Sequence, residues 1–379
     1  MSERIYLDHN ATSPLRPKVR EAVIAALDAY GNPSSVHAEG RAARALIEAA
    51  REKVARLVGA GAEDVIFTSG GTEANALALA PRRDGTWSYF WSAIEHPSVL
   101  AWRADARTVT QIPVTGSGVI DLSILAAELA KPHLEGATPF VSLMLANNET
   151  GALQPVAAAA AIVHKAGGLV HSDAVQAAGK VPVDLAASGA DMISLSAHKF
   201  GGPKGVGALV LRQGVSVEPL IKGGGQEKRR RAGTENVAGI VGFGVAAELA
   251  AKDLSKAASI AVLRDELEAR VLAAAPDAIV FSGDVARLPN TSVLAVPGTK
   301  AETLLIGLDL EGIAVSSGSA CSSGKVEASH VLRAMGVAPE LAQGAIRISL
   351  GPDNKGADIE KFVTAWSELI ARLKGRKAA

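Results

Sequence analysis

Apolar residues recur with the period of an α-helix in two segments near the start of the chain. The first segment opens at Pro17, is followed by Gly31, and places five apolar residues on one face: Val19, Ala22, Val23, Ala26 and Leu27. Proline is favoured in the first turn of a helix and glycine just beyond its end, so this segment predicts an amphipathic helix. The second segment keeps the same period through residues 46–58 and stops at Gly59, which predicts a second helix.

Short apolar runs rich in β-branched residues follow. They occupy residues 65–68, 140–146, 169–172, 192–196 and 208–211. Several lack alternation of apolar and polar positions, which is typical of strands that are covered on both faces. Because these strands are separated by helical segments, the pattern predicts an α/β fold with a mostly parallel sheet.

The last third of the chain has a different pattern. A long, Ala-rich helical stretch covers residues 246–267, two predicted strands cover 291–296 and 345–350, and an amphipathic helix covers 359–373. We place the domain change in the Ala-rich stretch. The prediction is a large α/β domain of residues 16–255 and a smaller α+β domain formed by residues 1–15 and 256–379.

Composition narrows the functional classes. The chain has 379 residues, of which 48% are hydrophobic and 21% charged, and its 39 basic and 39 acidic residues cancel. This is a globular composition without the charge that would attract nucleic acid or an anionic membrane. No apolar stretch reaches the roughly 18 to 20 residues of a membrane span, and the N-terminal residues lack the apolar region of a signal peptide. We therefore expect a cytoplasmic protein with no nucleic-acid or membrane partner.

Cys321 is the only cysteine, which excludes an intramolecular disulfide or a cysteine-based metal site within a single chain. It lies in a Ser- and Gly-rich run, residues 316–324, that cannot build a core. Unreactive cysteines are usually buried as small hydrophobes, so a thiol on such a loop suggests a reactive group. On the loop alone, an incidental cysteine is equally compatible.

Two charged residues follow neighbouring predicted strands. Asp173 ends the run at 169–172, and Lys199 follows the run at 192–196. Both can therefore lie at the carboxyl edge of the sheet, where open α/β sheets bind ligands. A lysine that forms a Schiff base and an aspartate that keeps the ring nitrogen protonated are what pyridoxal phosphate requires. An ordinary structural ion pair is the alternative for these two residues alone.

Residues 68–75 follow a predicted strand and open a helix. Unpaired N–H groups at a helix N-terminus favour phosphate, Gly71 permits close backbone approach, and Thr72 adds a hydroxyl donor. A plain strand–helix turn is the alternative, because the segment has neither P-loop nor dinucleotide-binding spacing.

Three further residues are candidates, each with a structural alternative. His96 could pack its ring on a flat cofactor and transfer protons, or be a partly buried loop residue. Asn147 ends another predicted strand in an Asn-Asn-Glu-Thr-Gly segment that also suits a turn. Arg347, on a probable strand, suits a bidentate grip on a carboxylate or a solvent-facing edge. The basic run at residues 228–231 is interpreted as a solvated loop.

Together these segments resemble the cysteine desulfurases of the NifS/IscS type, which are fold-type I enzymes dependent on pyridoxal phosphate. The resemblance extends over essentially the whole chain. Its matching segments are residues 6–12, 31–35, 69–75, 95–97, 147–151, 173–176, 196–199, 231–236 and the Cys321 loop. Ser13 departs from the pattern, where a second threonine is usual, and residues 87–91 match no pattern of the family.

The resemblance implies a large domain with a mostly parallel, seven-stranded sheet and a pyridoxal phosphate site. Lys199 would hold the cofactor, Asp173 its ring nitrogen, Gln176 its phenolic oxygen, and His96 would stack on the ring. The implied phosphate ligands are Gly71, Thr72, Ser196, His198 and, from a second subunit of a homodimer, Thr234. Asn147 is implied at the cofactor and, with Arg347, at the carboxylate of the substrate.

The implied reaction removes sulfur from L-cysteine, leaves a persulfide on Cys321 and releases alanine. The persulfide would pass to a sulfur-acceptor or iron–sulfur scaffold protein for cluster assembly or other sulfur trafficking, and Cys321 could ligate iron in such a complex. Two other enzymes of this fold remain open, a selenocysteine lyase and a class-V aminotransferase. A non-catalytic persulfide carrier or assembly scaffold is the third alternative, and the set of Lys199, Asp173 and His96 argues against it.

Overall fold

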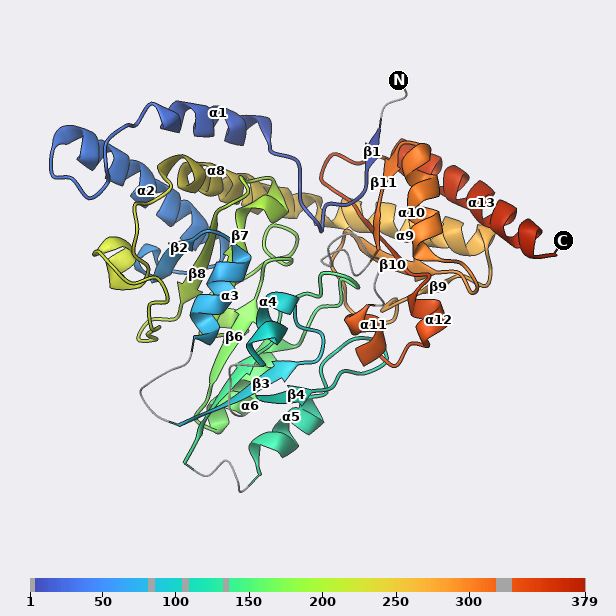
Figure 1. Cartoon of the computed structure of the whole chain (residues 1–379), viewed down its shortest axis with the longest axis horizontal. Helices are drawn as coiled ribbons and strands as arrows, with labels where there is room; N and C mark the ends of the chain where they lie inside the picture. Colours follow the sequence, from blue (N-terminus) through green and yellow to red (C-terminus); the bar gives the residue numbers. More distant parts are fainter. Residues whose placement is uncertain (1–3, 81–85, 104–108, 132–135, 318–328, 379) are drawn as a thin grey trace.

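The structure is a computed structural model that describes residues 4–80, 86–103, 109–131, 136–317 and 329–378. Its larger part is built on one sheet, and its smaller part contains the N-terminal strand and most of the chain after residue 256 (Figure 1). The connecting residues between β1 (Ile5–Tyr6) and α1 (Pro17–Leu27) pass from the smaller to the larger part (Figure 1).

The larger part contains a seven-stranded sheet in which β8 alone runs against its neighbours. In spatial order its strands are β2 (Val65–Thr68), β8 (Gly207–Leu211), β7 (Met192–Ser196), β6 (Leu169–Asp173), β5 (Thr138–Ser142), β3 (Trp87–Ser92) and β4 (Val109–Ile112). The pairs from β7 through β4 are parallel, whereas β8 is antiparallel to both β7 and β2. The predicted α/β class and mostly parallel sheet are confirmed.

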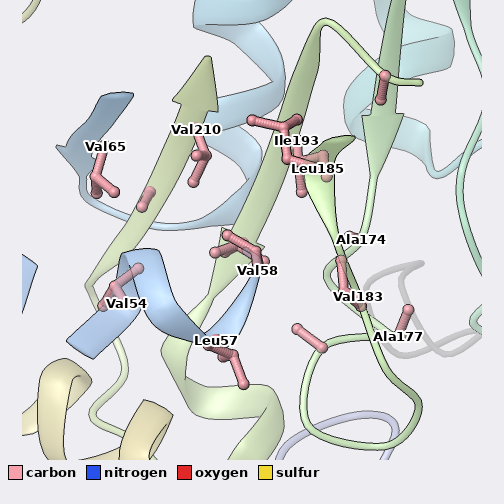
Figure 2. Close-up of a cluster of buried hydrophobic side chains, with 14 of the residues drawn as sticks. Val54, Leu57, Val58, Val65, Ala174, Ala177, Val183, Leu185, Ile193 and Val210 are labelled. Atoms are coloured by element: carbon pink, nitrogen blue, oxygen red, sulfur yellow. The ribbon is translucent and has the colours of Figure 1, made fainter. Parts of the chain in front are cut away.

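Helices cover both faces of this sheet. Ile193 and Val210 pack on one face with Val54 of α2 (Figure 2). Their chain neighbours Met192 and Leu209 pack on the other face. Successive strand residues point to opposite faces, so continuous apolar runs are what this arrangement requires. The first face is covered by α1 (Pro17–Leu27), α2 (Ala38–Leu57), α5 (Leu122–Leu129), α6 (Val156–Lys165), α7 (Leu185–Ser188) and α8 (Val237–Asp253). The second face is covered by α3 (Gly71–Leu79) and α4 (Pro97–Leu100).

The smaller part has two short sheets and five helices among the described residues. Its four-stranded sheet has the order β12 (Ser316–Ser317), β13 (Ile346–Ser349), β10 (Thr291–Ala295) and β9 (Ile279–Val280), and β1 (Ile5–Tyr6) pairs with β11 (Ile313–Ala314). The helices are α9 (Ala257–Ala274), α10 (Ala301–Leu310), α11 (His330–Ala334), α12 (Pro339–Ala342) and α13 (Gly356–Ala378). Its core is separate from the two cores on the large sheet, and Trp366 of α13 is buried in it.

The helix predictions hold best where glycine or proline marks an end. The first helix begins at Pro17 as predicted and ends at Leu27, the last residue of its apolar face, four residues before Gly31. By contrast, α2 begins at Ala38, ahead of its predicted apolar period, with the His37 ring accepting the Gly40 N–H at its start. The single helix expected over 246–267 is wrong, because α8 and α9 are separated by a 3-10 turn at Leu254–Lys256. The domain boundary at 255/256 stays a prediction.

Two strands of the large sheet, β3 and β4, were not predicted from the apolar runs. The Trp-rich segment that matched no family pattern forms β3, which pairs with β4 and β5. The predicted strand at 140–146 is shifted, since β5 covers Thr138–Ser142. Beyond it, the N–H groups of Leu143 and Leu145 still donate to carbonyls of His171 and Asp173 in β6.

Candidate active site

Side chains at the carboxyl ends of several strands surround a cavity of about 220 Å³. Asp173 ends β6, Ser196 ends β7, and Lys199 follows in the 3-10 turn Ala197–Phe200. This is the sheet edge at which parallel α/β folds bind ligands. The cavity brings together eight of the predicted site residues: Gly71, Thr72, His96, Asp173, Gln176, Ser196, His198 and Lys199.

The Asp173 carboxylate is buried and held from two sides. It accepts hydrogen bonds from Nδ2 of Asn75 at 2.7 Å and from the N–H of Val175 at 2.9 Å. A carboxylate fixed in this way can present its charge to a ring nitrogen without reorganising. Asn75, on α3, was not predicted as a site residue, although it lies one helical turn beyond Thr72 on the same helix.

The Lys199 amine points toward the N-terminal segment. Its Nζ donates to the carbonyl oxygens of Asn10 at 2.7 Å and Ala11 at 3.1 Å. The amide Nε2 of Gln176 donates to the same Asn10 carbonyl at 2.9 Å. Asn10 therefore joins two cavity residues, which the sequence did not predict.

His96 caps the short helix α4, and this fixes its tautomer. Its Nδ1 accepts the N–H of Ser98 at 3.1 Å, so in the neutral ring the proton is on Nε2. Burial lowers the pKa of His96, helped by the charges of Lys199 and His330 and opposed by that of Asp173. His96 is therefore a neutral imidazole at neutral pH.

The N-terminus of α3 and the end of β7 together suit a phosphate. The first N–H groups of α3 have no partners within the helix, and no side chain caps it. A Cβ on Gly71 would lie 2.8 Å from Cγ2 of Val175, so only glycine fits there without displacing its neighbour. Burial, with the charges of Lys199 and Lys204, lowers the pKa of His198 to about 4.

Asn147 and Arg347 lie behind the cavity wall. The amide of Asn147 is used within its turn, where Oδ1 accepts the N–H groups of Glu149 and Thr150 and Nδ2 donates to the carbonyl of Ile94. This is the turn chemistry that was the alternative for this segment, and direct contact of Asn147 with cofactor or substrate stays a prediction. The following residue, Asn148, lines the cavity instead.

Arg347, on β13, is buried and is positioned by two oxygens. It donates to Oδ1 of Asp8 at 2.7 Å and to the carbonyl of Asn148 at 2.9 Å. Its buried Nε has no hydrogen-bond partner among the described residues. The guanidinium therefore keeps one donor available beside the residue that lines the cavity.

Thr234, the phosphate ligand expected from a second subunit, does not line this cavity. Thr234 is exposed and lines a separate hollow of about 140 Å³ with Ser69 and Arg231. Cys321 lies outside the described residues. Within the basic run, Arg231 pairs with Glu73, while Lys228 and Arg229 are exposed.

A larger cavity of about 520 Å³ lies on the other side of Lys199, between the two parts of the molecule. Its charged residues include Arg16 and Asp253, which are paired with each other. Asp173 and His96 line only the smaller cavity of the two. We therefore place the reacting groups in the smaller cavity.

The described part of the chain contains neither a metal site nor a membrane-spanning helix. No group of three or more His, Cys, Asp or Glu side chains is arranged to hold a metal ion there. No helix within the same residues combines the length and the apolar character needed to cross a bilayer.

Comparison with known proteins decides the family. The Aminotransferase class-V family model matches residues 5–362. A cysteine desulfurase from Cereibacter sphaeroides is 46% identical, with 98% of this chain and 97% of that protein covered. One from Klebsiella pneumoniae is 43% identical, with 98% and 94% covered. The chain belongs to the class-V aminotransferase family, among its cysteine desulfurases.

Solved structures of this family have the same fold. The NifS-like protein from Rickettsia africae is 41% identical, with a TM-score of 0.90, and the match covers 97% of this chain and all 100% of that one. The structure of SspA in complex with cysteine is 30% identical, with a TM-score of 0.78, and covers 92% and 99%. The resemblance of the sequence to the cysteine desulfurases is thereby confirmed.

Class-V aminotransferases and cysteine desulfurases depend on pyridoxal phosphate, and the cavity fits that group. Among the described residues, the buried oxygens Oδ1 of Asn75 and Asn148 have no hydrogen-bond partner at the cavity. The glycine-lined helix start, the fixed carboxylate of Asp173 and the amine of Lys199 would be the partners of its phosphate, ring nitrogen and aldehyde.

Proposed function

We propose that this chain removes sulfur from L-cysteine, releasing L-alanine and leaving a persulfide on Cys321. The observation that carries the proposal is the meeting of Lys199, Asp173 and His96 around one cavity in a chain of the cysteine desulfurase family. A structural neighbour, SspA, is described in complex with cysteine, which supports cysteine as the substrate.

The bound cofactor supplies an electron sink for the bonds of the substrate's α-carbon. Lys199 would bind its aldehyde and, once released, would move the α-proton. The Asp173 carboxyl group would pair with the ring nitrogen, and Gln176 would donate an N–H to the phenolic oxygen. His96 would stack on the ring and could supply a proton from Nε2. These roles rest on the distances and hydrogen bonds given above.

The phosphate is assigned to the start of α3 and the end of β7. Gly71 and Thr72 offer backbone and hydroxyl donors, and Ser196 at the end of β7 and His198 in the following 3-10 turn close the site. Thr234 of the partner subunit completes it in a homodimer. Exposed apolar side chains on and beside α1 and α2 support a covered surface there: Ile24, Leu27, Tyr30 and Val36.

Arg347 is assigned to the substrate carboxylate. Its guanidinium is already placed by Asp8 and by the Asn148 carbonyl, so a carboxylate would meet an oriented donor. Asn147 contributes by holding the turn that presents Asn148. Asp8 would share Arg347 with the substrate.

The chain on both sides of residues 318–328 is attached near Arg347. Ser316 pairs with Arg347 across β12 and β13, and Ser329 donates to the buried carboxylate of Glu149. Cys321 follows Ser317 by a few residues, a stretch of chain that spans at most about 14 Å. A thiol is only a few per cent ionised at neutral pH, so transfer of its proton must accompany attack on the substrate sulfur.

The persulfide is then passed to a sulfur-acceptor or iron–sulfur scaffold protein, and we place the reaction in the cytoplasm. In such a complex Cys321 could also ligate iron of a cluster under assembly. These assignments rest on the proposed chemistry, since a sulfane sulfur on a protein thiol transfers to another thiolate by exchange.

Product analysis tests the proposal. Purified protein with L-cysteine and a reductant should release alanine and sulfide in equal amounts, and Cys321→Ser should bind the cofactor normally but release neither. Formation of a keto acid without sulfide would identify an aminotransferase. Full sulfide release by Cys321→Ser would overturn the role of Cys321, and strong preference for selenocysteine would favour the lyase.

A further inference from the structure

Lys180 has no part in the chemistry above, yet its amine contacts two residues of the site. Its Nζ donates to Oδ1 of Asn10 at 2.7 Å and to Oε1 of Gln176 at 2.7 Å. The half-buried side chain of Lys180 lines the larger cavity. Gln176 and Lys199 line the smaller cavity, and Lys180 does not. No carboxylate among the described residues forms an ion pair with it.

These contacts determine how both amides are oriented. The Lys180 amine is the donor in both contacts and a carbonyl only accepts, so Gln176 must direct Oε1 to Lys180 and Nε2 to the Asn10 carbonyl. Asn10 is fixed in the same way, with Oδ1 toward Lys180 and Nδ2 donating to the carbonyl of Asn148. Gln176 therefore presents its second N–H to the smaller cavity, and not its carbonyl oxygen.

Lys180 and Lys199 also share Asn10. One amine bonds its side chain and the other its backbone carbonyl. Burial, with the charges of Lys199 and Arg347, lowers the pKa of Lys180 well below its usual value. Repulsion between two like charges is mutual, so a cation at Lys180 opposes a cation at Lys199 by the same amount. A lysine beside a second cation is more readily the neutral nucleophile.

We infer that Lys180 is a positioning residue that fixes the amides of Gln176 and Asn10 and favours the uncharged, reactive form of the Lys199 amine. The inference rests on the proposed function only in taking Lys199 as the residue that binds pyridoxal phosphate.

Other titratable groups surround the two amines. The charge of Lys180 or Lys199 lowers the pKa of the rings of His9, His96 and His198. Asp173 on β6 raises the pKa of His96, and Arg347 on β13 lowers that of Lys180. Arg16 lowers the pKa of His9, Lys204 lowers that of His198, and Asp8 pairs with Arg347. All of these remain in a variant at position 180, so a difference from the parent reports on Lys180.

The test measures how apoprotein reacts with added pyridoxal phosphate. The rate at which the Schiff-base absorption band appears is recorded against pH for the parent, Lys180→Met and Lys180→Arg. With Lys180→Met, the midpoint should move up by about one pH unit and the rate near neutral pH should fall about tenfold. Lys180→Arg keeps the charge and should stay nearer the parent. The control Lys165→Met removes an exposed lysine at the end of α6 and should change nothing.

An unchanged midpoint in folded Lys180→Met overturns the inference. If that variant does not fold, as judged by circular dichroism, Lys180→Gln keeps one amide donor without the charge and carries the same prediction. A parent that forms no band, or a Lys199→Ala variant that forms the parent's band, contradicts the proposed function instead. The two failures are therefore distinguishable.

Discussion

Glu95 is a fully buried carboxyl group beside the site, and replacing it with glutamine should change how stability depends on pH. Its Oε1 accepts the N–H of Met144 at 2.6 Å, while Oε2 has no hydrogen-bond partner among the described residues. Burial, reinforced by the charge of Asp173, raises the pKa of Glu95 from 4.5 to about 8. The Glu95 carboxyl group is therefore protonated in the folded protein at neutral pH.

The direction of the pH dependence of stability follows from proton binding. Between pH 4.5 and about pH 8, the folded protein binds a proton at Glu95 that the unfolded chain releases, so the free energy of unfolding falls as pH rises. One pKa unit is worth about 1.4 kcal/mol, which gives a loss of about 3 to 4 kcal/mol between pH 5 and pH 8. Glu95→Gln cannot titrate and can keep the Met144 bond, so this loss should be absent from the variant.

Guanidinium unfolding of the apoprotein, followed by tryptophan fluorescence at several pH values, measures the effect. The stability of Glu95→Gln minus that of the parent should increase steadily from pH 5 to pH 8. Glu21→Gln, the same change at an exposed position of α1, is the control and should give a constant difference. A constant difference for Glu95→Gln as well would refute the claim that Glu95 is buried in its neutral form.

Two further substitutions test local features of the fold by the same unfolding measurement. Glu227→Gln should lower the free energy of unfolding by about 3 kcal/mol, because it leaves the buried Arg51 guanidinium, now 2.7 Å from Glu227, with only the more exposed Glu48 as a counter-charge; parent-like stability would contradict this. Arg229→Gly should raise stability by about 1 kcal/mol, because exposed Arg229 has a left-handed backbone with φ of 65° that glycine adopts without strain. A loss of stability in Arg229→Gly would mean that its side chain has a stabilising role.

The sequence predicted elements well where a local signal marks their ends. Pro17 begins α1, and the continuous apolar runs of β7 and β8 reflect helices on both faces of the sheet. The break between α8 and α9 falls at Leu254–Lys256, which contains neither glycine nor proline and could not be recognised locally. The edge strand β4 is only partly buried, so its apolar pattern is weak.

The sequence predicted the site residues that lie at or just after the ends of strands. Asp173, Ser196 and Lys199 converge because parallel strands end at one edge. The contacts of Asn10 and Lys180 were not predictable, because they join residues 170 positions apart through side-chain hydrogen bonds that no local pattern encodes. Asn147 shows a different limit of the sequence. Its segment matches the family pattern, and in the structure its amide oxygen accepts the hydrogen bonds of a turn.

Transfer of sulfur to Cys321 is the central claim, and a single-turnover mass measurement tests it most directly. The holoenzyme is mixed with less than one equivalent of L-cysteine without reductant, then quenched, and its peptides are mapped. We expect the Cys321 peptide to gain the mass of one sulfur atom, in an amount equal to the alanine released. Alanine formed without added sulfur on that peptide, or sulfur carried elsewhere in the protein, would contradict the account.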